Sequence, residues 1–263
     1  MKNIRKYGEA PFSVAVIHGG PGGSGSVALV AKELAHVCGV LEPLQTQKTI
    51  NGQLQELKKV IEEYGTLPII LIGWSWGAWL SYLFAAYYPA MVKKLILVSS
   101  GPFEERYVQQ LQETRLNRLN AEEKIKLQVL KKVFDDPAVL DKNVFFSQFG
   151  ELMDRSDTYE PLPVVEKNTS TVQFDIYQAI WPEAAALRKS GELLKLGEKI
   201  VCPVIAIHGD YDPHPAAGVE KPLSRVIKNF KFILLKNCGH TPWIEKKAKN
   251  KFYEILKKEV TVP

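Results

Sequence analysis

Three polar residues, far apart in the sequence, have the types and the order that nucleophilic catalysis requires. Ser75, Asp212 and His240 follow one another as serine, acid and histidine. A serine hydroxyl is a weak nucleophile at neutral pH and needs a base to remove its proton. Histidine can act as that base when a carboxylate orients its ring. Residues of these types in this order predict a triad for acyl transfer, with Ser75 as nucleophile, an aspartate near residue 212 as acid and His240 as base.

The surroundings of Ser75 favour this interpretation. It is the central residue of GWSWG at residues 73–77, a G-x-S-x-G pentapeptide. The apolar run at residues 67–72 predicts a strand before it, and residues 78–88 predict a helix after it. A serine at a sharp turn from strand to helix is a nucleophile elbow, which projects the hydroxyl from the end of a sheet. The pentapeptide alone also occurs in ordinary glycine-rich turns.

The region around the acid leaves two alternatives open. Asp210 follows the same apolar run, residues 200–207, and could replace Asp212 as the acid or simply cap the loop. The alternation of His208, Asp210, Asp212 and His214 also fits a metal site, because alternate residues of a strand share one face. Prolines interrupt any strand at this point, and a serine triad accounts for Asp212 without an ion, so we expect no metal.

A glycine-rich loop near the amino terminus could hold the negative charge that develops on a substrate oxygen. Residues 13–17 predict a strand that runs into HGGPGGSG at residues 18–25. Glycine leaves room for a backbone N–H to approach the substrate. We expect the N–H groups of Gly20 and Trp76 to form an oxyanion hole. The loop lacks the lysine of a P-loop and the spacing of a dinucleotide-binding loop, which argues against phosphate binding.

The elements that must position these residues alternate between strand and helix. Helices expected at residues 25–38 and 51–64 lie between the strands already named, and a further strand is expected at residues 94–98. This β-α-β-α-β order predicts an α/β fold with a mainly parallel sheet. Loops that follow parallel strands emerge at one edge of the sheet, where all three triad residues would meet.

The motifs together resemble the α/β-hydrolase superfamily over essentially the whole chain. HGGPGG at residues 18–23 resembles the loop of the proline iminopeptidase-like branch, GDYD at 209–212 resembles its acid element, and GH at 239–240 its last motif. Trp74 stands where that branch usually has glycine. The resemblance implies an α/β-hydrolase fold, favours Asp212 as the acid, and requires no cofactor.

The same resemblance suggests a division of the chain into three parts. Residues 1–101 and 199–263 would form the two halves of the α/β-hydrolase core, and residues 102–198 would form a wholly helical cap over the active site. Two of the expected cap helices lie at residues 171–181 and 183–194. Relatives place a two-stranded hairpin before the glycine loop, whereas residues 1–11 can hold at most one short strand. We therefore expect a truncated sheet edge.

Composition and charge exclude several other classes of protein. The chain has 263 residues, is 46% hydrophobic and carries a net charge of +5, too mild and dispersed to indicate nucleic-acid binding. The sequence shows neither a signal peptide nor a run long enough to span a membrane, and its three cysteines are widely spaced. We expect a cytoplasmic protein, as a monomer or a homodimer.

Charge differs between the predicted cap and the core. Acidic residues outnumber basic ones between residues 102 and 198, and the remainder is basic. An acidic cap could attract a peptide with a free amino terminus, although solvated helix faces explain the same charges. In iminopeptidases cap carboxylates meet the substrate amine, but no motif assigns that role to any of the possible counterparts, which are Glu151, Asp154, Asp157, Glu160 and Glu183.

The sequence therefore predicts a serine hydrolase for a small-molecule ester, amide or short peptide. Two other functions use the same features. One is acyl transfer to an acceptor other than water. The other is a ligand-binding or signalling protein on a hydrolase scaffold, which the complete triad disfavours because binding alone does not need it.

Overall fold

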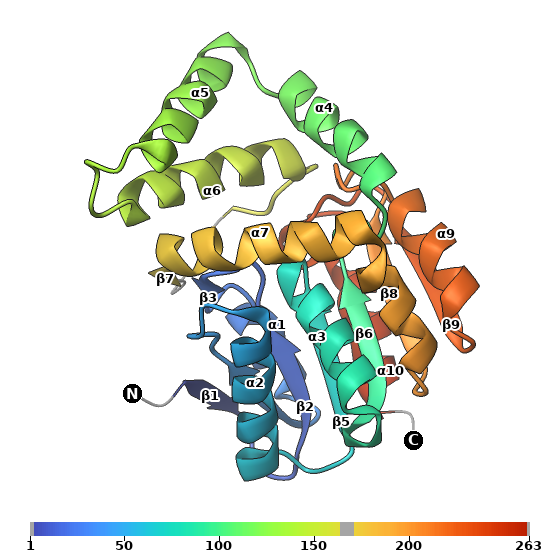
Figure 1. The fold of residues 1–263 in the computed structure, drawn as a ribbon. Coiled ribbons are helices and arrows are strands. Elements are labelled where there is room, and N and C mark those ends of the chain that lie inside the picture. The colour runs from blue at the N-terminus through green and yellow to red at the C-terminus, as the bar shows by residue number, and fades with distance from the viewer. Residues whose placement is uncertain (1–2, 164–170, 262–263) are drawn as a thin grey trace.

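A seven-stranded sheet forms the centre of the protein, in a computed structural model that describes residues 3–163 and 171–261 (Figure 1). The strand order is β1-β4-β2-β5-β6-β8-β9, and all neighbours are parallel except β1 and β4. The strands are β1 (Ile4–Tyr7), β2 (Phe12–Ile17), β4 (Gly39–Pro43), β5 (Ile69–Trp74), β6 (Val92–Val98), β8 (Val204–Gly209) and β9 (Phe230–Leu235). One short strand, β1, precedes β2, as expected for a truncated sheet edge.

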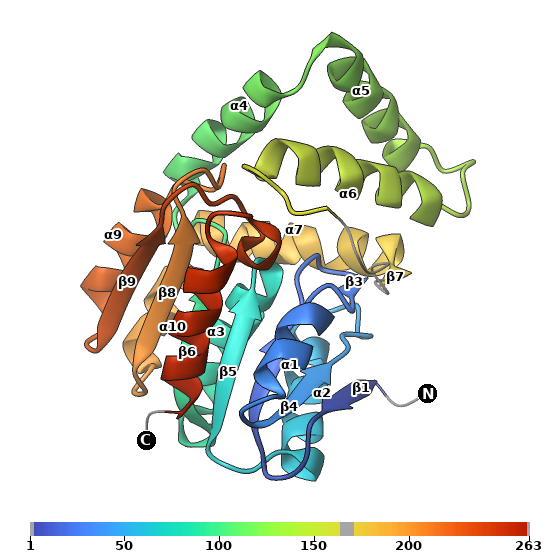
Figure 2. The same ribbon diagram turned by 180° about the vertical axis from the view of Figure 1, so that it is seen from behind.

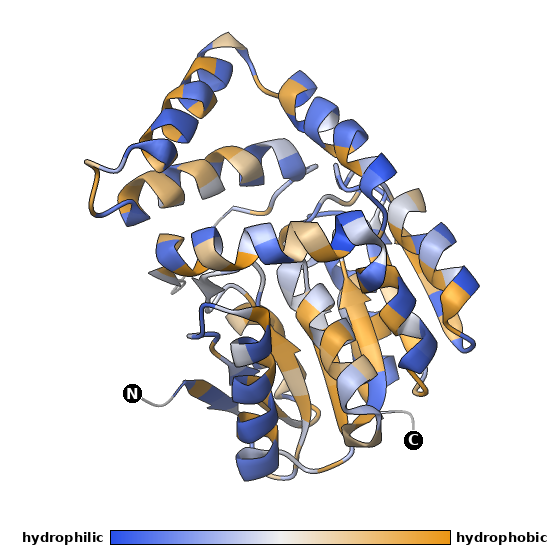
Figure 3. Ribbon diagram, viewed as in Figure 1, coloured by the Kyte–Doolittle hydropathy of each residue, from blue (hydrophilic) through white to orange (hydrophobic). Residues whose placement is uncertain are grey.

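Helices cover both faces of this sheet. Their bounds are α1 (Ala28–Leu34), α2 (Ile50–Tyr64), α3 (Trp76–Tyr87), α9 (Ala217–Val226) and α10 (Lys249–Thr261). Helices α1 and α10 lie on the face seen in Figure 2, and α2, α3 and α9 lie on the opposite face. Central strands such as β5 and β8 read as nearly continuous apolar runs because both of their faces are buried (Figure 3).

Alternate residues of a strand supply the two halves of the core. In β2, Ala15 and Ile17 pack into the cluster beneath α2 and α3, whereas Val14 and Val16 pack beneath α1 and α10. Full burial of one such aliphatic side chain is worth about 1.5–3 kcal/mol. The two clusters therefore hold the central strands, and with them the loops at their carboxyl ends, in a fixed arrangement.

The segment between β6 and β8 lies across the carboxyl ends of the strands (Figure 1). Its helices are α4 (Val108–Arg118), α5 (Ala121–Asp135), α6 (Asn143–Asp157), α7 (Phe174–Ser190) and α8 (Glu192–Lys195). The prediction of a wholly helical insertion was wrong in one detail. The two-residue strand β7 (Thr171–Val172) pairs with β3 (Gly23–Ser24), because the insertion contacts the glycine-rich loop there.

The two helices expected on either side of Pro182 are one continuous helix, α7. Proline removes one helical hydrogen bond and normally ends or kinks a helix. Ile180 and Ala184 are fully buried on either side of it, so packing against the core overrides the local preference. As a result Trp181 and Arg188 lie on one helix, about two turns apart.

Among the residues that the structure describes, none of the helices combines the length and the apolar character that crossing a bilayer would require.

The elbow depends on a contact that only glycine allows. A Cβ built on Gly77, at the start of α3, would lie 2.2 Å from the carbonyl oxygen of Ile17. By contrast, a Cβ on Gly150 in α6 would meet nothing within 4 Å. Both glycines are helical, so the two sites differ mainly in the space around them.

We predict that Gly77→Ala lowers the free energy of unfolding by about 1–3 kcal/mol or more, because β2 and α3 must move apart. Gly150→Ala should instead raise it by up to about 1 kcal/mol, because alanine favours an open helical position. Urea denaturation of both variants measures the difference. A Gly77→Ala protein as stable as the Gly150→Ala protein would contradict the close packing.

Candidate active site

Ser75 lies at the junction of β5 and α3 in a backbone conformation that few residues adopt. Its φ and ψ are 55° and −117°, and its amide donates to the carbonyl of Val98 at 3.0 Å. A residue with a side chain is strained at this φ and persists there only where its surroundings hold it. A Cβ on Gly73 would lie 2.2 Å from the carbonyl oxygen of Gly77, so strand and helix approach closely on either side. The local geometry is that of a nucleophile elbow.

His240 and Asp212 come together next to this elbow. The Nδ1 atom of His240 lies 2.8 Å from Oδ2 of Asp212, and both side chains are buried. The indole N–H of Trp74 donates to the carbonyl of His240 at 2.9 Å, which ties the loop after β9 to the end of β5. The rings of Trp74 and His240 are 5.3 Å apart. Among the described residues no hydrogen bond reaches the hydroxyl of Ser75. The hydrogen bond between a catalytic serine and its base is often long before substrate binds.

Asp210, the other candidate acid, is turned away from His240. Its Oδ1 accepts the amide N–H of Cys238 at 3.3 Å, and its Oδ2 lies 3.7 Å from the ammonium of Lys236. It therefore braces the loop after β9. The structure brings Asp212, and not Asp210, into contact with the imidazole.

His214 is part of this cluster, although the sequence pattern pointed to it only as a metal ligand. Its Nδ1 lies 2.8 Å from Oδ1 of Asp212, and its backbone N–H donates to the same oxygen at 3.0 Å. Its ring stacks on that of His240, with 4.4 Å between centroids. The carboxylate thus holds one imidazole on each of its oxygens. The proximity of a histidine to the acid was the only signal for it in the sequence.

The alternative of a metal site required His208, Asp210, Asp212 and His214 to lie on one face of a strand. Strand β8 ends at Gly209, so the alternation from His208 to His214 does not lie on one strand face. Ligand atoms of Asp212, His214 and His240 do lie within 4.8 Å of one another. However, the carboxylate already pairs with Nδ1 of both imidazoles, and these contacts account for the cluster without an ion.

The electrostatics favour an ionised carboxylate beside a basic imidazole. Burial alone would raise the pKa of Asp212, but the surrounding histidines hold it well below its ordinary value. Burial would lower the pKa of His240, but the Asp212 carboxylate outweighs it and leaves the pKa raised. Burial dominates at His214 and lowers its pKa to about 4, so this ring is neutral at pH 7. Of the two imidazoles on this carboxylate, His240 therefore has the higher pKa and His214 the lower.

The glycine-rich loop is held by a buried histidine. The Nδ1 of His18 lies 2.9 Å from the carbonyl of Gly19, and its Nε2 accepts the backbone N–H of Gln45 at 3.0 Å. These two contacts assign the neutral ring with its proton on Nδ1. Burial lowers the pKa of His18 to about 4, which agrees with that state. The side chain of Gln45 donates back to the carbonyl of His18 at 2.9 Å, so the loop is anchored twice.

Gln45 also connects this loop to the elbow. Its side-chain oxygen accepts the indole N–H of Trp76 at 3.0 Å. A Cβ on Gly19 would lie 3.2 Å from the Cβ of Ser75, so the loop lies directly against the serine. Trp76 is the first residue of α3, where a backbone N–H has no partner within the helix. In the described part of the chain, no hydrogen bond from the amide N–H of Gly20 or of Trp76 is found.

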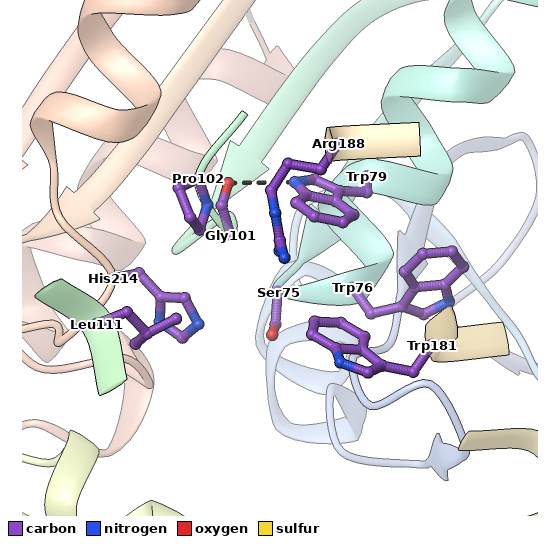
Figure 4. A pocket seen from close by; sticks show the side chains of 9 residues that line it. All are labelled: Ser75, Trp76, Trp79, Gly101, Pro102, Leu111, Trp181, Arg188 and His214. Atoms are coloured by element: carbon purple, nitrogen blue, oxygen red, sulfur yellow. Dashed lines mark hydrogen bonds between the residues drawn. The ribbon is translucent and has the colours of Figure 1, made fainter. Parts of the chain in front are cut away.

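A small cavity lies next to Ser75, with a volume of about 30 Å³, or room for about two water molecules (Figure 4). It is lined by residues from both the core and the insertion. They are Ser75, Trp76, Trp79, Gly101, Pro102, Leu111, Trp181, Arg188 and His214. Trp181 stacks on Trp79 at 6.2 Å with the rings nearly parallel. Helix α7 therefore forms one wall of the site.

The acidic residues of the insertion mostly have other partners. Asp157 pairs with Arg115, and its carbonyl accepts the backbone N–H of His240 at 2.8 Å, so the end of α6 supports the histidine loop. Glu160 pairs with Lys246, and Glu183 accepts the amide of Ile50 at the start of α2. Glu151 and Asp154 are exposed.

Comparison with known proteins shows the family of the chain. Residues 14–249 match the model of the family described as "Alpha/beta hydrolase family". The chain belongs to this family. It is 25% identical to a proline iminopeptidase of Saccharolobus solfataricus, over 93% of this chain and 83% of the relative. It is 26% identical to a proline iminopeptidase of Lactobacillus crispatus, over 93% of this chain and 88% of the relative.

The solved structure of VinJ shares the fold with a TM-score of 0.67, at 18% identity, covering 98% of this chain and 93% of that one. The sequence-based prediction of an α/β-hydrolase with distant proline iminopeptidase relatives is therefore confirmed.

We predict that His18→Ala lowers the free energy of unfolding by about 1–3 kcal/mol, because it leaves the buried amide of Gln45 without its acceptor. It should also speed amide hydrogen exchange in residues 18–25. His36 is exposed and serves as the matched control. His36→Ala should change stability by less than about 0.5 kcal/mol. Unchanged exchange in the His18 variant would show that this histidine does not hold the loop.

Proposed function

We propose that the protein is a serine hydrolase that cleaves a small ester, amide or short peptide through an acyl-enzyme. The observation that carries this proposal is the 2.8 Å contact between His240 and Asp212 beside a serine held at positive φ. Membership of the alpha/beta hydrolase family supports it, and the proline iminopeptidase relatives support a peptide bond as one option.

Each residue has a defined task in the proposed reaction. His240 takes the proton of Ser75 through Nε2 as the serine oxygen attacks the carbonyl carbon. The amides of Gly20 and Trp76 donate to the oxyanion of the tetrahedral intermediate. The intermediate expels the alcohol or amine, which receives the proton from His240. Water then attacks the acyl-serine with the same base, releasing the acid and restoring the hydroxyl.

Asp212 orients His240 and stabilises its cationic form, which its low pKa and buried position suit. His214 occupies the other carboxylate oxygen and fixes the direction of Asp212. We propose it as a positioning residue. Transfer of the acyl group to an acceptor other than water would use the same groups. Both a monomer and a homodimer are compatible with this proposal. A cytoplasmic location also stays a prediction.

We predict that Ser75→Ala abolishes whatever turnover the natural chain shows in a panel of p-nitrophenyl esters and prolyl naphthylamides, while the protein stays folded. The natural chain should react with a fluorophosphonate at Ser75, and mass spectrometry of the labelled peptide locates the adduct. A folded natural chain that never labels would favour the ligand-binding alternative. Activity retained in Ser75→Ala would remove the proposed nucleophile.

The two histidines on Asp212 allow a direct comparison. His240→Ala should lower kcat by at least about 10³-fold, because the base is lost. His214→Ala should cost much less, about 10-fold, because it removes one hydrogen bond to the acid. Circular dichroism checks that both variants fold. If His214→Ala proves the more damaging of the two, His214 is the base and the proposed roles are exchanged.

The pH profile reports the charge of His240. A base acts only when it is unprotonated, and the raised pKa keeps His240 protonated to higher pH than an ordinary histidine. We therefore predict that kcat/KM rises with pH through a midpoint above about 6.5. Asp212→Asn should lower the rate by about 10⁴-fold and move that midpoint to lower pH. A midpoint that stays in place in Asp212→Asn would show that another group controls the profile.

A further inference from the structure

A buried arginine lies next to Ser75 and has no part in the reaction described above. Arg188 projects from α7 into the cavity beside the serine (Figure 4). Only 7% of its surface is exposed. Its guanidinium lies 5.6 Å from the ring centre of Trp79, close enough for a cation–π contact. The whole length of the side chain is therefore held by the core and by the insertion.

The guanidinium is only partly paired. Its Nε donates to Oε2 of Glu105 at 2.8 Å. No hydrogen bond from either terminal nitrogen is found among the described residues, and both belong to a group that borders the cavity. The side chain of Glu105 is 47% exposed, so solvent screens its attraction to the positive charge of the guanidinium. Arginine keeps its proton in proteins, so these nitrogens present positively charged donors to whatever occupies the cavity.

The position of Arg188 relative to the proposed base decides which part of a substrate it would meet. His214 lies on one side of Ser75 in Figure 4, whereas Trp76, Trp79 and Trp181 lie on the other, and the Arg188 side chain enters from the side of Trp79. His240 stacks on His214 and therefore lies on that first side. The leaving group takes its proton from His240 and must leave there. The cavity near Arg188 thus faces the acyl part of a substrate.

We propose that this cavity selects an acyl group that ends in a carboxylate. The terminal nitrogens of Arg188 match the two oxygens of a carboxylate in a bidentate pair. The stacked Trp79 and Trp181 provide apolar walls for a short methylene chain. The cavity has room for about two water molecules and opens to the outside. It would therefore take the carboxylate end of such a group, and the chain that links this end to the carbonyl must be short. The substrate class is a monoester or monoamide of a short dicarboxylic acid.

This inference rests on the proposed serine hydrolase activity and narrows its substrates. It also separates the protein from an aminopeptidase, because a cationic amino terminus placed in the same cavity would meet the positive charge of Arg188. Glu105, the acid that pairs with the guanidinium, engages Nε, and no described acidic residue forms a hydrogen bond with the terminal nitrogens.

The test compares esters that differ in one charge. Monoethyl succinate and monoethyl glutarate are anionic, and ethyl butyrate and ethyl valerate are their neutral counterparts; ethanol release follows all four. We expect kcat/KM for the better anionic ester to exceed that of its neutral counterpart by about 10- to 100-fold. In Arg188→Gln this ratio should fall to about one. Arg188→Lys keeps the charge without the planar fork and should retain only part of the ratio.

Arg106→Gln is the matched control, because Arg106 is exposed and pairs with Glu104 away from the cavity. It should keep both the activity and the ratio of the natural chain. Equal rates on anionic and neutral esters in the natural chain, with Ser75 still labelled by a fluorophosphonate, would overturn the carboxylate site and leave the hydrolase proposal standing. This comparison holds even if Arg188→Gln does not fold, because it needs no variant.

A binding measurement separates the two proposals further. Glutarate titrated into Ser75→Ala by calorimetry should bind, and the double variant Ser75→Ala with Arg188→Lys should bind it about 10-fold more weakly. If no ester is cleaved and no label is incorporated, the hydrolase proposal fails, and glutarate binding that depends on Arg188 would still support the anion site. Absence of glutarate binding together with equal ester rates would remove the site.

Discussion

One buried carboxylate organises the candidate site. Asp212 holds His240 on one oxygen and His214 on the other, each at 2.8 Å. An ionised group in the interior persists only when its partners compensate for the lost water. Here the partners include the imidazole next to the nucleophile elbow, so the contacts that keep Asp212 charged also set the direction of His240. The pKa of Asp212 therefore depends on both imidazoles, and the pKa of each imidazole depends on the carboxylate.

The backbone around Ser75 gives the second constraint. Strand β2, strand β5 and helix α3 approach so closely that Gly73 and Gly77 have no room for a side chain. His18 and Gln45 then hold the glycine-rich loop against the same elbow. Hydrogen-bond donors that face a reacting oxygen are useful only if they do not have to move during the reaction. The packing of the core thus fixes both the serine and the amides proposed to serve it.

The insertion covers the site and also supplies side chains that line the cavity. Its helix α7 places the indole of Trp181 and the guanidinium of Arg188 at the cavity, and the end of α6 supports the backbone of His240. The groups proposed to be catalytic come from the edge of the sheet, whereas the cavity wall opposite the proposed base combines Trp76 and Trp79 of the core with Trp181 and Arg188 of the insertion. That division explains how one fold accepts different substrates.

Local patterns in the sequence determined much of the fold and the position of the nucleophile elbow. GWSWG between an apolar run and a helix predicted the elbow, and alternating strands and helices predicted the parallel sheet, because both depend on neighbours in the chain. Tertiary structure alone decided that Asp212 rather than Asp210 meets His240, that His214 shares the carboxylate, and that α7 continues through Pro182 to bring Arg188 to the cavity. These outcomes depend on contacts between segments far apart in sequence, and only the packing of the whole core determines which side chains reach one another.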